Sequence, residues 1–230
     1  MFDIIYEDQD LRVYNKPADI SLLRDRSGRP DFWQALQASG EKPYMVHRLD
    51  KGTSGVLLVA RRQRVQSELT RAFNAQTVSK YYLAWVTGLF PCADTYRITL
   101  PLCKGRKSRY RVAGNRVDIK QNGHNFDIQQ DRQGVAAVTL ARGLIHSNEK
   151  NPRTLLLLRP LSGRTHQLRV HMSWLGFPIL GDHLYGKPND PAQTARRLML
   201  HCHRIVVPGR GSFTAPISGA NFPARAPASY

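Results

Sequence analysis

The chain has 230 residues, 41% of them hydrophobic, which is enough to bury the core of one compact catalytic unit. Its 34 Lys and Arg residues outnumber its 17 Asp and Glu residues, and this excess favours a polyanion such as nucleic acid as partner, although solvated arginines also occur on ordinary enzymes. No stretch is apolar and long enough to cross a bilayer, and the N-terminus lacks a secretion-signal pattern, so we expect a soluble, cytoplasmic protein. The three cysteines are widely spaced and form no CxxC pair, so we expect no disulfides.

Six short runs rich in β-branched and aromatic residues predict strands. In chain order they are residues 4–6, 11–15, 56–60, 81–86, 135–140 and 154–158. Between the third and fourth runs, residues 61–77 repeat apolar side chains at helical spacing, which predicts an amphipathic helix. The apolar face of this helix consists of Val65, Leu69, Ala72 and Phe73.

A second helix is predicted to begin at about Thr165 and to end at Gly176, a residue suited to a left-handed helix cap. Its apolar face would contain Leu168, Met172 and Leu175. Strands and helices do not alternate regularly along the chain, so the order of elements favours an α+β fold. The Gly-, Ala- and Pro-rich C-terminus predicts an irregular tail.

The segment 105–116, GRKSRYRVAGNR, combines a dense basic run with Tyr110. Such a composition is typical of a loop that follows RNA phosphates and offers an aromatic ring for stacking. A solvated hairpin explains the composition nearly as well, so both interpretations stay open.

The segment 46–60, VHRLDKGTSGVLLVA, carries most of the chemical information. Its single carboxylate, Asp50, stands among three basic residues, and cationic neighbours favour the ionised form that a nucleophile requires. The two glycines permit tight backbone geometry, and the hydroxyls of Thr53 and Ser54 can tie the loop down. A turn in which Asp50 only caps backbone amides is the alternative.

Residues 47–55, HRLDKGTSG, resemble the signature of the RluA-type RNA pseudouridine synthases, in which HRLD is followed by two variable residues and TSG. Other segments resemble further motifs of that family in the expected order. They are Asn15-Lys16-Pro17, KYYLA at 80–84, GRTHQLRVHMSWLGFPILGD from Gly163, LMLHCH at 198–203 and FTAP at 213–216. The sequence ADIS at 18–21 departs from the family, which commonly has a small residue, a glycine and apolar residues there. The resemblance runs from about residue 4 to residue 222.

This resemblance implies an α+β pseudouridine synthase core, a mixed and mostly antiparallel sheet flanked by helices with a central RNA-binding cleft. It implies an isomerase that needs neither a metal nor another cofactor. We expect residues 1–222 to form the catalytic domain and residues 223–230 an irregular tail, without the S4 domain that many relatives carry. We further expect a monomer whose partner is RNA, with ribosomal RNA preferred over transfer RNA.

By resemblance, Asp50 is the catalytic aspartate, which attacks the ribose C1′ or the uracil C6, or promotes elimination to a glycal. Tyr82 would stack on the uracil and move a proton. Arg169 would pair with Asp50 and keep it ionised, with Arg164 as the competing partner. Arg48 matches the arginine that enters the RNA helix in place of the flipped uridine. The substrate and RNA contacts that we expect are His47, Arg48, Thr53, Arg164 and His166.

Two other classes of function stay open at this point. A non-catalytic RNA-binding protein would keep the fold without the chemistry, but the joint presence of Asp50, Tyr82 and Arg169 argues against it. A metal-dependent hydrolase is suggested by the eight histidines, among them His166 and His171. The sequence contains no HExxH and no paired CxxC motif, which weakens that interpretation.

Overall fold

The computed structural model describes residues 2–24, 28, 31–40, 42–106, 109–128, 133–147, 151–186, 195–217 and 222. The chain divides into two compact units, of which unit 1 is Met1–Lys80 with His201–Tyr230 and unit 2 is Tyr81–Leu200. The tail predicted at 223–230 lies outside the described residues, and the boundaries of the catalytic domain stay a prediction. Both units combine strands with helices, which confirms the α+β class.

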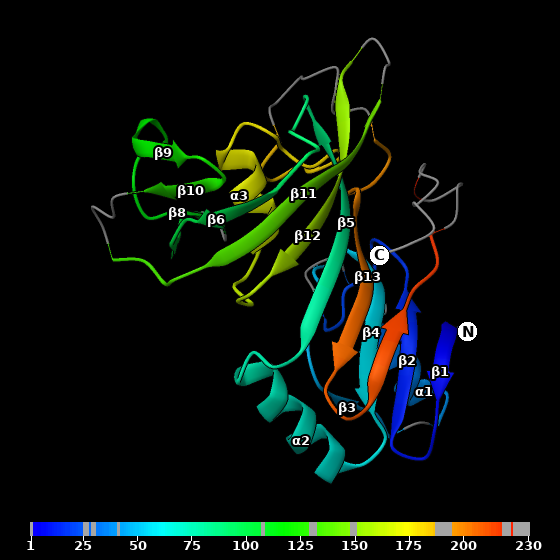
Figure 1. Ribbon diagram of the computed structural model, residues 1–230. Helices are drawn as coiled ribbons and strands as arrows, with labels where there is room; N and C mark the ends of the chain where they lie inside the picture. The colour runs from blue at the N-terminus through cyan, green and yellow to red at the C-terminus, as the bar shows by residue number, and fades with distance from the viewer. Residues whose placement is uncertain are drawn as a thin grey trace. The chain divides into compact units, whose positions relative to one another are not determined.

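Four strands form the centre of unit 1, and Figure 1 shows them side by side. Their order is β1 (Asp3–Glu7), β2 (Leu11–Lys16), β4 (Ser54–Ala60) and β13 (Leu200–Val207), while β3 (Tyr44–Met45) pairs with β4 and β14 (Gly211–Thr214) pairs with β13. The pair β4 and β13 is parallel, and the other pairs of this unit are antiparallel. All seven residues of β4 are buried, which explains the continuous apolar run at 56–60.

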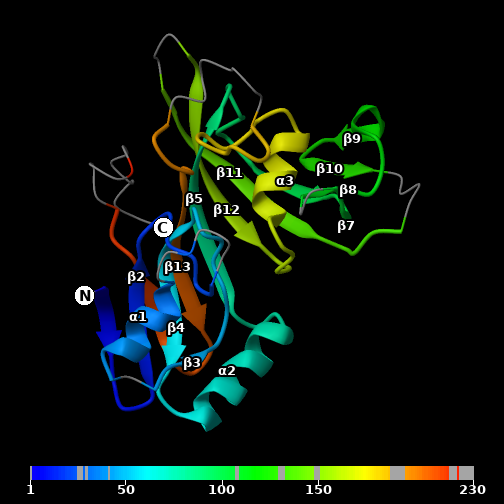
Figure 2. The ribbon, with the colours of Figure 1, turned by 180° about the vertical axis from the view of Figure 1, so that it is seen from behind.

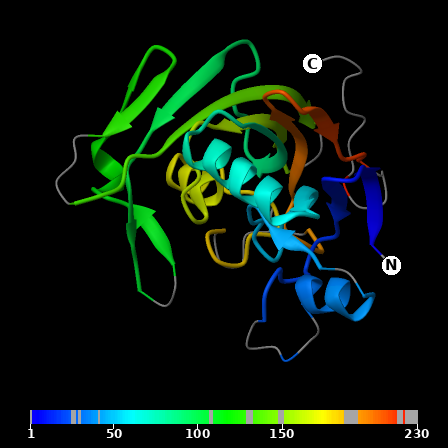
Figure 3. The same cartoon turned by 90° about the horizontal axis from the view of Figure 1, so that it is seen from below.

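Unit 1 also contains the helices α1 (Phe32–Ala38) and α2 (Gln63–Asn74). Phe32 of α1 packs edge-on against Tyr14 of β2, with ring centroids 5.4 Å apart, and α1 lies over the strands in the view of Figure 2. Figure 3 shows α2 in front of the strands of this unit. Val65 and Leu69 of α2 are buried, which confirms the apolar face predicted from their spacing.

Unit 2 is built on a second run of six strands. Their order is β5 (Ser79–Thr87), β12 (Arg153–Pro160), β11 (Val138–Ser147), β6 (Thr95–Thr99), β10 (Asn125–Ile128) and β9 (Ile119–Asn122). Only β6 and β10 pair in parallel among these described strands, so the arrangement is mixed and mostly antiparallel, as expected. The short strands β7 (Leu102–Lys104) and β8 (Tyr110–Val112) form a separate hairpin, and the 3-10 turn η1 (Arg116–Asp118) follows it.

The helix α3 (Gln167–Trp174) covers one face of β11 and β12 (Figures 1 and 2). It begins two residues later than predicted and is buried along Gln167–Ser173, polar side chains included. Gly176 has φ +92° and follows the helix in a reversed turn in which the amide of Phe177 donates to the carbonyl of Met172 over 2.9 Å. This geometry confirms the left-handed cap.

All six predicted strands are present with shifted ends, and one shift has a clear cause. The run predicted at 135–140 becomes a strand only from Val138 onward, because Val135 forms an isolated bridge with Leu102. No helix among the described residues is long and apolar enough to span a membrane.

Candidate active site

The signature segment forms the loop that leads into β4. The carbonyl of Asp50 accepts a hydrogen bond from the amide of Thr53 over 3.0 Å, which closes a tight turn. Leu49 is buried, whereas Arg48 is exposed and Asp50 is half-buried. The loop is therefore anchored through Leu49 and keeps Arg48 and Asp50 accessible from solvent.

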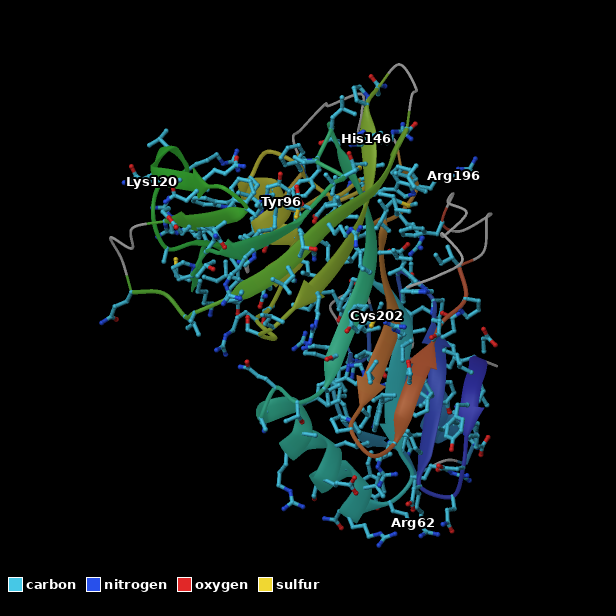
Figure 4. All side chains as sticks on the ribbon, viewed as in Figure 1. Arg62, Tyr96, Lys120, His146, Arg196 and Cys202 are labelled. Atoms are coloured by element: carbon cyan, nitrogen blue, oxygen red, sulfur yellow. The ribbon has the colours of Figure 1, made fainter. Side chains whose placement is uncertain are left out.

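Two adjacent residues fasten this loop to β13, the strand on which Figure 4 labels Cys202. The hydroxyl of Ser54 lies 2.8 Å from Nδ1 of His201, and both side chains are buried. Gly55 has φ +112°, and a Cβ at this position would lie 2.2 Å from the carbonyl oxygen of Cys202. Only glycine permits this approach, so the end of the signature is held in place by the parallel pairing of β4 with β13.

Lys16 holds the backbone of the same loop from a second side. Its side chain is fully buried, and its ammonium donates to the carbonyls of Pro17, Ile20 and Lys51 over 2.8, 2.9 and 3.2 Å. A buried cation is stable only when its protons are accepted in this way. Because Lys51 directly follows Asp50, Lys16 fixes the turn that contains Asp50, a role that the sequence alone did not reveal.

His47 makes its contacts inside unit 1. Its Nε2 accepts a hydrogen bond from the amide of Leu58 over 3.0 Å, and its ring stacks on Phe73 at a centroid distance of 4.7 Å. Burial, with a smaller effect from the nearby charge of Lys80, lowers the pKa of His47 to about 3. His47 is therefore neutral and anchors the loop against β4, and the RNA contact expected for it stays a prediction.

Tyr82 lies in β5, directly opposite Leu158 of β12, and is half-buried. Side chains alternate along a strand, so Tyr82 shares its face of the sheet with Ala84, while Tyr81 points to the other face. The guanidinium of Arg159 lies 5.5 Å from the ring centre of Tyr81. The two neighbouring tyrosines thus have different surroundings, and the catalytic assignment of Tyr82 stays a prediction.

Arg169 is a buried arginine on α3. Its Nε and Nη2 donate to the two carboxylate oxygens of Asp182 over 2.8 and 2.7 Å. Asp50 belongs to unit 1 and Arg169 to unit 2, and the predicted pairing of these two residues stays a prediction.

The two other residues expected from this motif precede α3. Arg164 is exposed, and its Nε donates to the carbonyl of Ala136 over 3.1 Å. His166 has φ +57° and lies at the N-terminus of the helix, where its Nδ1 is 2.7 Å from the hydroxyl of Tyr185. The exposed arginine is accessible for an RNA phosphate, whereas the histidine takes part in an internal contact.

The basic segment 105–116 begins in the β7–β8 hairpin, which supports the hairpin interpretation for its first part; residues 107 and 108 lie outside the described residues. Lys104, Arg106 and Arg109 of this hairpin are exposed. Tyr110 packs its ring edge-on to His166, so it is half-buried within unit 2. The hairpin therefore presents cations on its surface, and stacking of Tyr110 on RNA stays a prediction.

The histidines that suggested a metal site serve other contacts. Nε2 of His171 donates to the carbonyl of Leu100 over 2.9 Å, and its Nδ1 lies 3.0 Å from the hydroxyl of Thr139. Burial lowers the pKa of His171 to about 4. Across the part of the chain that the structure describes, no group of three or more His, Cys, Asp or Glu side chains is arranged to hold a metal ion.

Comparison with known proteins identifies the family to which this sequence is similar. The sequence model of the RNA pseudouridylate synthase family matches residues 10–174. The dual-specificity RNA pseudouridine synthase RluA of Escherichia coli (strain K12) is 31% identical over 229 residues, which cover 99% of this chain and 93% of the relative. Ribosomal large subunit pseudouridine synthase D of Borreliella burgdorferi is 35% identical over 96% of this chain, which spans 65% of that relative's length.

The fold agrees with the sequence comparison. The human RNA pseudouridylate synthase domain containing 1 superposes with a TM-score of 0.77 at 26% identity, over 94% of this chain and 84% of the human one. The family match extends over more than half of the chain and contains both Asp50 and Arg169. The chain therefore belongs to the RNA pseudouridylate synthase family and is an RNA pseudouridine synthase, an isomerase.

Proposed function

We propose that Asp50 is the nucleophile with which this enzyme isomerises uridine in structured RNA, and that ribosomal RNA is its substrate in preference to transfer RNA. One observation carries the proposal for Asp50. The turn that contains this carboxylate is held by buried contacts of Lys16 and Ser54, yet Asp50 itself stays half-exposed. A reactive carboxylate must combine a fixed position with access to the substrate.

The reaction breaks the bond between C1′ of the ribose and N1 of the uracil and forms a bond between C1′ and C5. The C5 proton is lost and N1 gains a proton, so no oxidant, reductant or group donor takes part. Attack of Asp50 on C1′, attack on C6 and elimination to a glycal all require an ionised carboxylate.

The target base must leave the RNA stack before Asp50 can reach it. Arg48 is exposed beside Asp50 and is suited to occupy the space that the flipped uridine leaves. Tyr82 would stack on the free uracil while it turns and would help to move the C5 proton. A phenol has a pKa of ~10 and is a weak base near neutral pH, so the surroundings of Tyr82 must assist this step.

The preference for ribosomal RNA is supported by the name of one relative and is tested separately from the chemistry. The Borreliella relative acts, by its name, on the ribosomal large subunit, whereas RluA is named as dual-specific. Purified protein is incubated with large-subunit ribosomal RNA and with total transfer RNA, both made as unmodified transcripts, and the pseudouridines are mapped. Faster conversion of a uridine in transfer RNA would overturn the preference and leave the role of Asp50 intact.

A further inference from the structure

Residues 182–185 form a turn after α3, and two of its side chains, Asp182 and Tyr185, contact Arg169. The carboxylate of Asp182 is fully buried and receives Nε and Nη2 of Arg169. Its Oδ1 also accepts hydrogen bonds from the backbone amides of Leu184 and Tyr185 over 3.0 and 3.1 Å. Four donors thus hold one carboxylate, so Asp182 is fixed by its own backbone as well as by Arg169.

This arrangement determines the direction of the guanidinium. The group is planar, and two parallel hydrogen bonds along one edge leave the Nη1 protons pointing away from Asp182. The ring of Tyr185 lies 5.1 Å from Cζ of Arg169. The carboxylate of Asp182 therefore holds one edge of the Arg169 guanidinium, and the ring of Tyr185 contacts the same group. Together these contacts fix the direction in which Nη1 points.

The hydroxyl of Tyr185 makes a second connection. It accepts a hydrogen bond from the backbone amide of Tyr110 over 2.9 Å and lies 2.7 Å from Nδ1 of His166. Tyr110 is the first residue of β8, in the hairpin that exposes Lys104, Arg106 and Arg109. One side chain therefore contacts Arg169 with its ring and the basic hairpin with its hydroxyl.

The turn has little freedom to relax. Gly181, which precedes it, has φ +71°, and a Cβ there would lie 1.9 Å from the carbonyl oxygen of Arg197. The hydroxyl of Ser173, on α3, donates to the carbonyl of Tyr185 over 2.7 Å. Both ends of the turn are thus fixed, so the loss of a single side-chain group should affect mainly the partner that this group holds.

We propose that Asp182 and Tyr185 are positioning residues with separate tasks. Asp182 aims the Arg169 guanidinium for the chemical step, and the Tyr185 hydroxyl holds the basic hairpin for RNA binding. The first task rests on the proposed role of Asp50 as nucleophile and on the predicted pairing of Arg169 with Asp50. Both residues act through others: Asp182 through Arg169, and Tyr185 through the backbone of Tyr110.

Asp182→Asn and Tyr185→Phe test the two tasks on one RNA. With Asp182→Asn, the single-turnover rate at saturating RNA should fall by about 100-fold, because a loosened group of the site costs about that much, whereas Kd should stay within about twofold. Asp182→Glu keeps the charge and should recover at least about tenfold of the lost rate. With Tyr185→Phe the ring remains, so the rate should stay within about twofold while Kd weakens by about tenfold, as for one lost hydrogen bond.

Two variants in unit 1 serve as matched controls. Asp10→Asn removes a carboxylate that pairs with Arg62, at the opposite end of β4 from Asp50, and Tyr6→Phe removes a hydroxyl that donates to Asp8. Both should keep the wild-type rate and Kd. Thermal unfolding followed by circular dichroism confirms that every variant is folded at the assay temperature. If Asp182→Asn does not fold, Asp182→Glu and Tyr185→Phe carry the test.

The outcomes separate this inference from the proposed function. Parallel losses of rate and affinity in both variants would show a merely structural turn and would overturn the inference. A wild-type rate for Asp182→Asn, measured beside an inactive Asp50→Asn and an impaired Arg169→Lys, would overturn the role of Asp182 alone. Activity in Asp50→Asn would instead overturn the proposed function, whatever Asp182 does.

Discussion

The hydroxyl of Ser54 and Nδ1 of His201 lie 2.8 Å apart in the interior of unit 1, although the two residues are 147 positions apart in the sequence. Nε2 of His201 faces the carbonyl of Ala215 at 3.4 Å and must donate there, so Nδ1 accepts the Ser54 proton. His201 thus supports the loop that contains Asp50 from the interior of the unit.

Ser54→Ala should lower the free energy of unfolding by about 1–3 kcal/mol, because the buried Nδ1 of His201 loses this donor. Urea unfolding at neutral pH measures the change. Ser67→Ala is the matched control, since Ser67 is exposed on α2 and its hydroxyl only donates to the carbonyl of Gln63 within the same helix. Equal stabilities of the two variants would contradict the supporting role of the Ser54–His201 bond.

Asp50→Asn should keep the fold and RNA binding but reduce activity by at least about 10⁴-fold, as for other single losses of a nucleophile. The amide preserves the shape of the side chain and loses only its charge. Tritium release from uridine labelled at C5 measures turnover, and a filter-binding assay measures Kd. Turnover within about tenfold of wild type would remove Asp50 from its assigned role.

His171 should make the protein less stable in acid. It is neutral when folded because burial lowers its pKa from 6.5 to about 4. Between these two values the unfolded chain binds a proton that the folded chain excludes, so the free energy of unfolding falls as the pH falls through this window. The effect of this one group is on the order of 3 kcal/mol.

Urea unfolding at about pH 7 and about pH 4.5 isolates this effect by comparison of variants. His171→Gln keeps a donor for the carbonyl of Leu100 and should lose less stability between the two pH values than wild type does. His183→Asn, at an exposed position, should follow wild type. If His171→Gln and wild type lose the same amount, the titration of His171 does not contribute to acid unfolding.

RNA affinity should depend steeply on salt, because a formal charge of +17 implies several phosphate contacts and each contact releases counterions. Replacement of Lys104, Arg106 and Arg109 by Gln should reduce the slope of log Kd against log salt by about one unit per lost contact. Replacement of Arg62 and Arg64 by Gln serves as the control, since both lie at the start of α2, where Figure 4 labels Arg62. An unchanged slope in the hairpin variant would place the RNA elsewhere.

Local sequence patterns predicted the elements that have a strong hydrophobic rhythm. β4 contains the continuous apolar run 56–60, and α2 repeats Val65 and Leu69 at helical spacing, so both could be found without tertiary information. The short helix α1 was missed because its seven residues carry no clear period. Asp31, which caps α1 by accepting the amide of Gln34 over 2.7 Å, was the available signal, since Asp followed three residues later by Gln is a capping pattern.

The sequence predicted the part of the candidate site whose residues lie in one segment. It did not predict the contacts between residues that are far apart in the sequence. Asp50 stands out because its basic neighbours are adjacent in the sequence. The contact of Lys16 with the carbonyl of Lys51 and the pairing of Arg169 with Asp182 join residues 35 and 13 positions apart. No periodicity links such positions, so these supports become visible only when the chain is folded.

Tyr82 should separate stacking from proton movement. Tyr82→Phe keeps the aromatic ring, so RNA binding should stay near wild type, while the loss of the hydroxyl should lower the single-turnover rate by about 10²–10⁴-fold, the usual contribution of a general acid or base. Tyr82→Leu removes the ring as well and should weaken binding by a further factor of about ten, because stacking of one base on an aromatic side chain contributes about 1–3 kcal/mol.

Tyr81→Phe is the matched control for Tyr82, since Tyr81 is the preceding residue of β5 and points to the opposite face, where it contacts Arg159. It should keep both the rate and the affinity, because the ring that contacts Arg159 is retained and no catalytic proton passes through it. Single-turnover rates and Kd values on one RNA compare all three variants. A Tyr82→Phe enzyme that keeps its rate, beside a Tyr82→Leu enzyme that loses affinity, would reduce Tyr82 to a stacking platform, and another group would have to move the C5 proton.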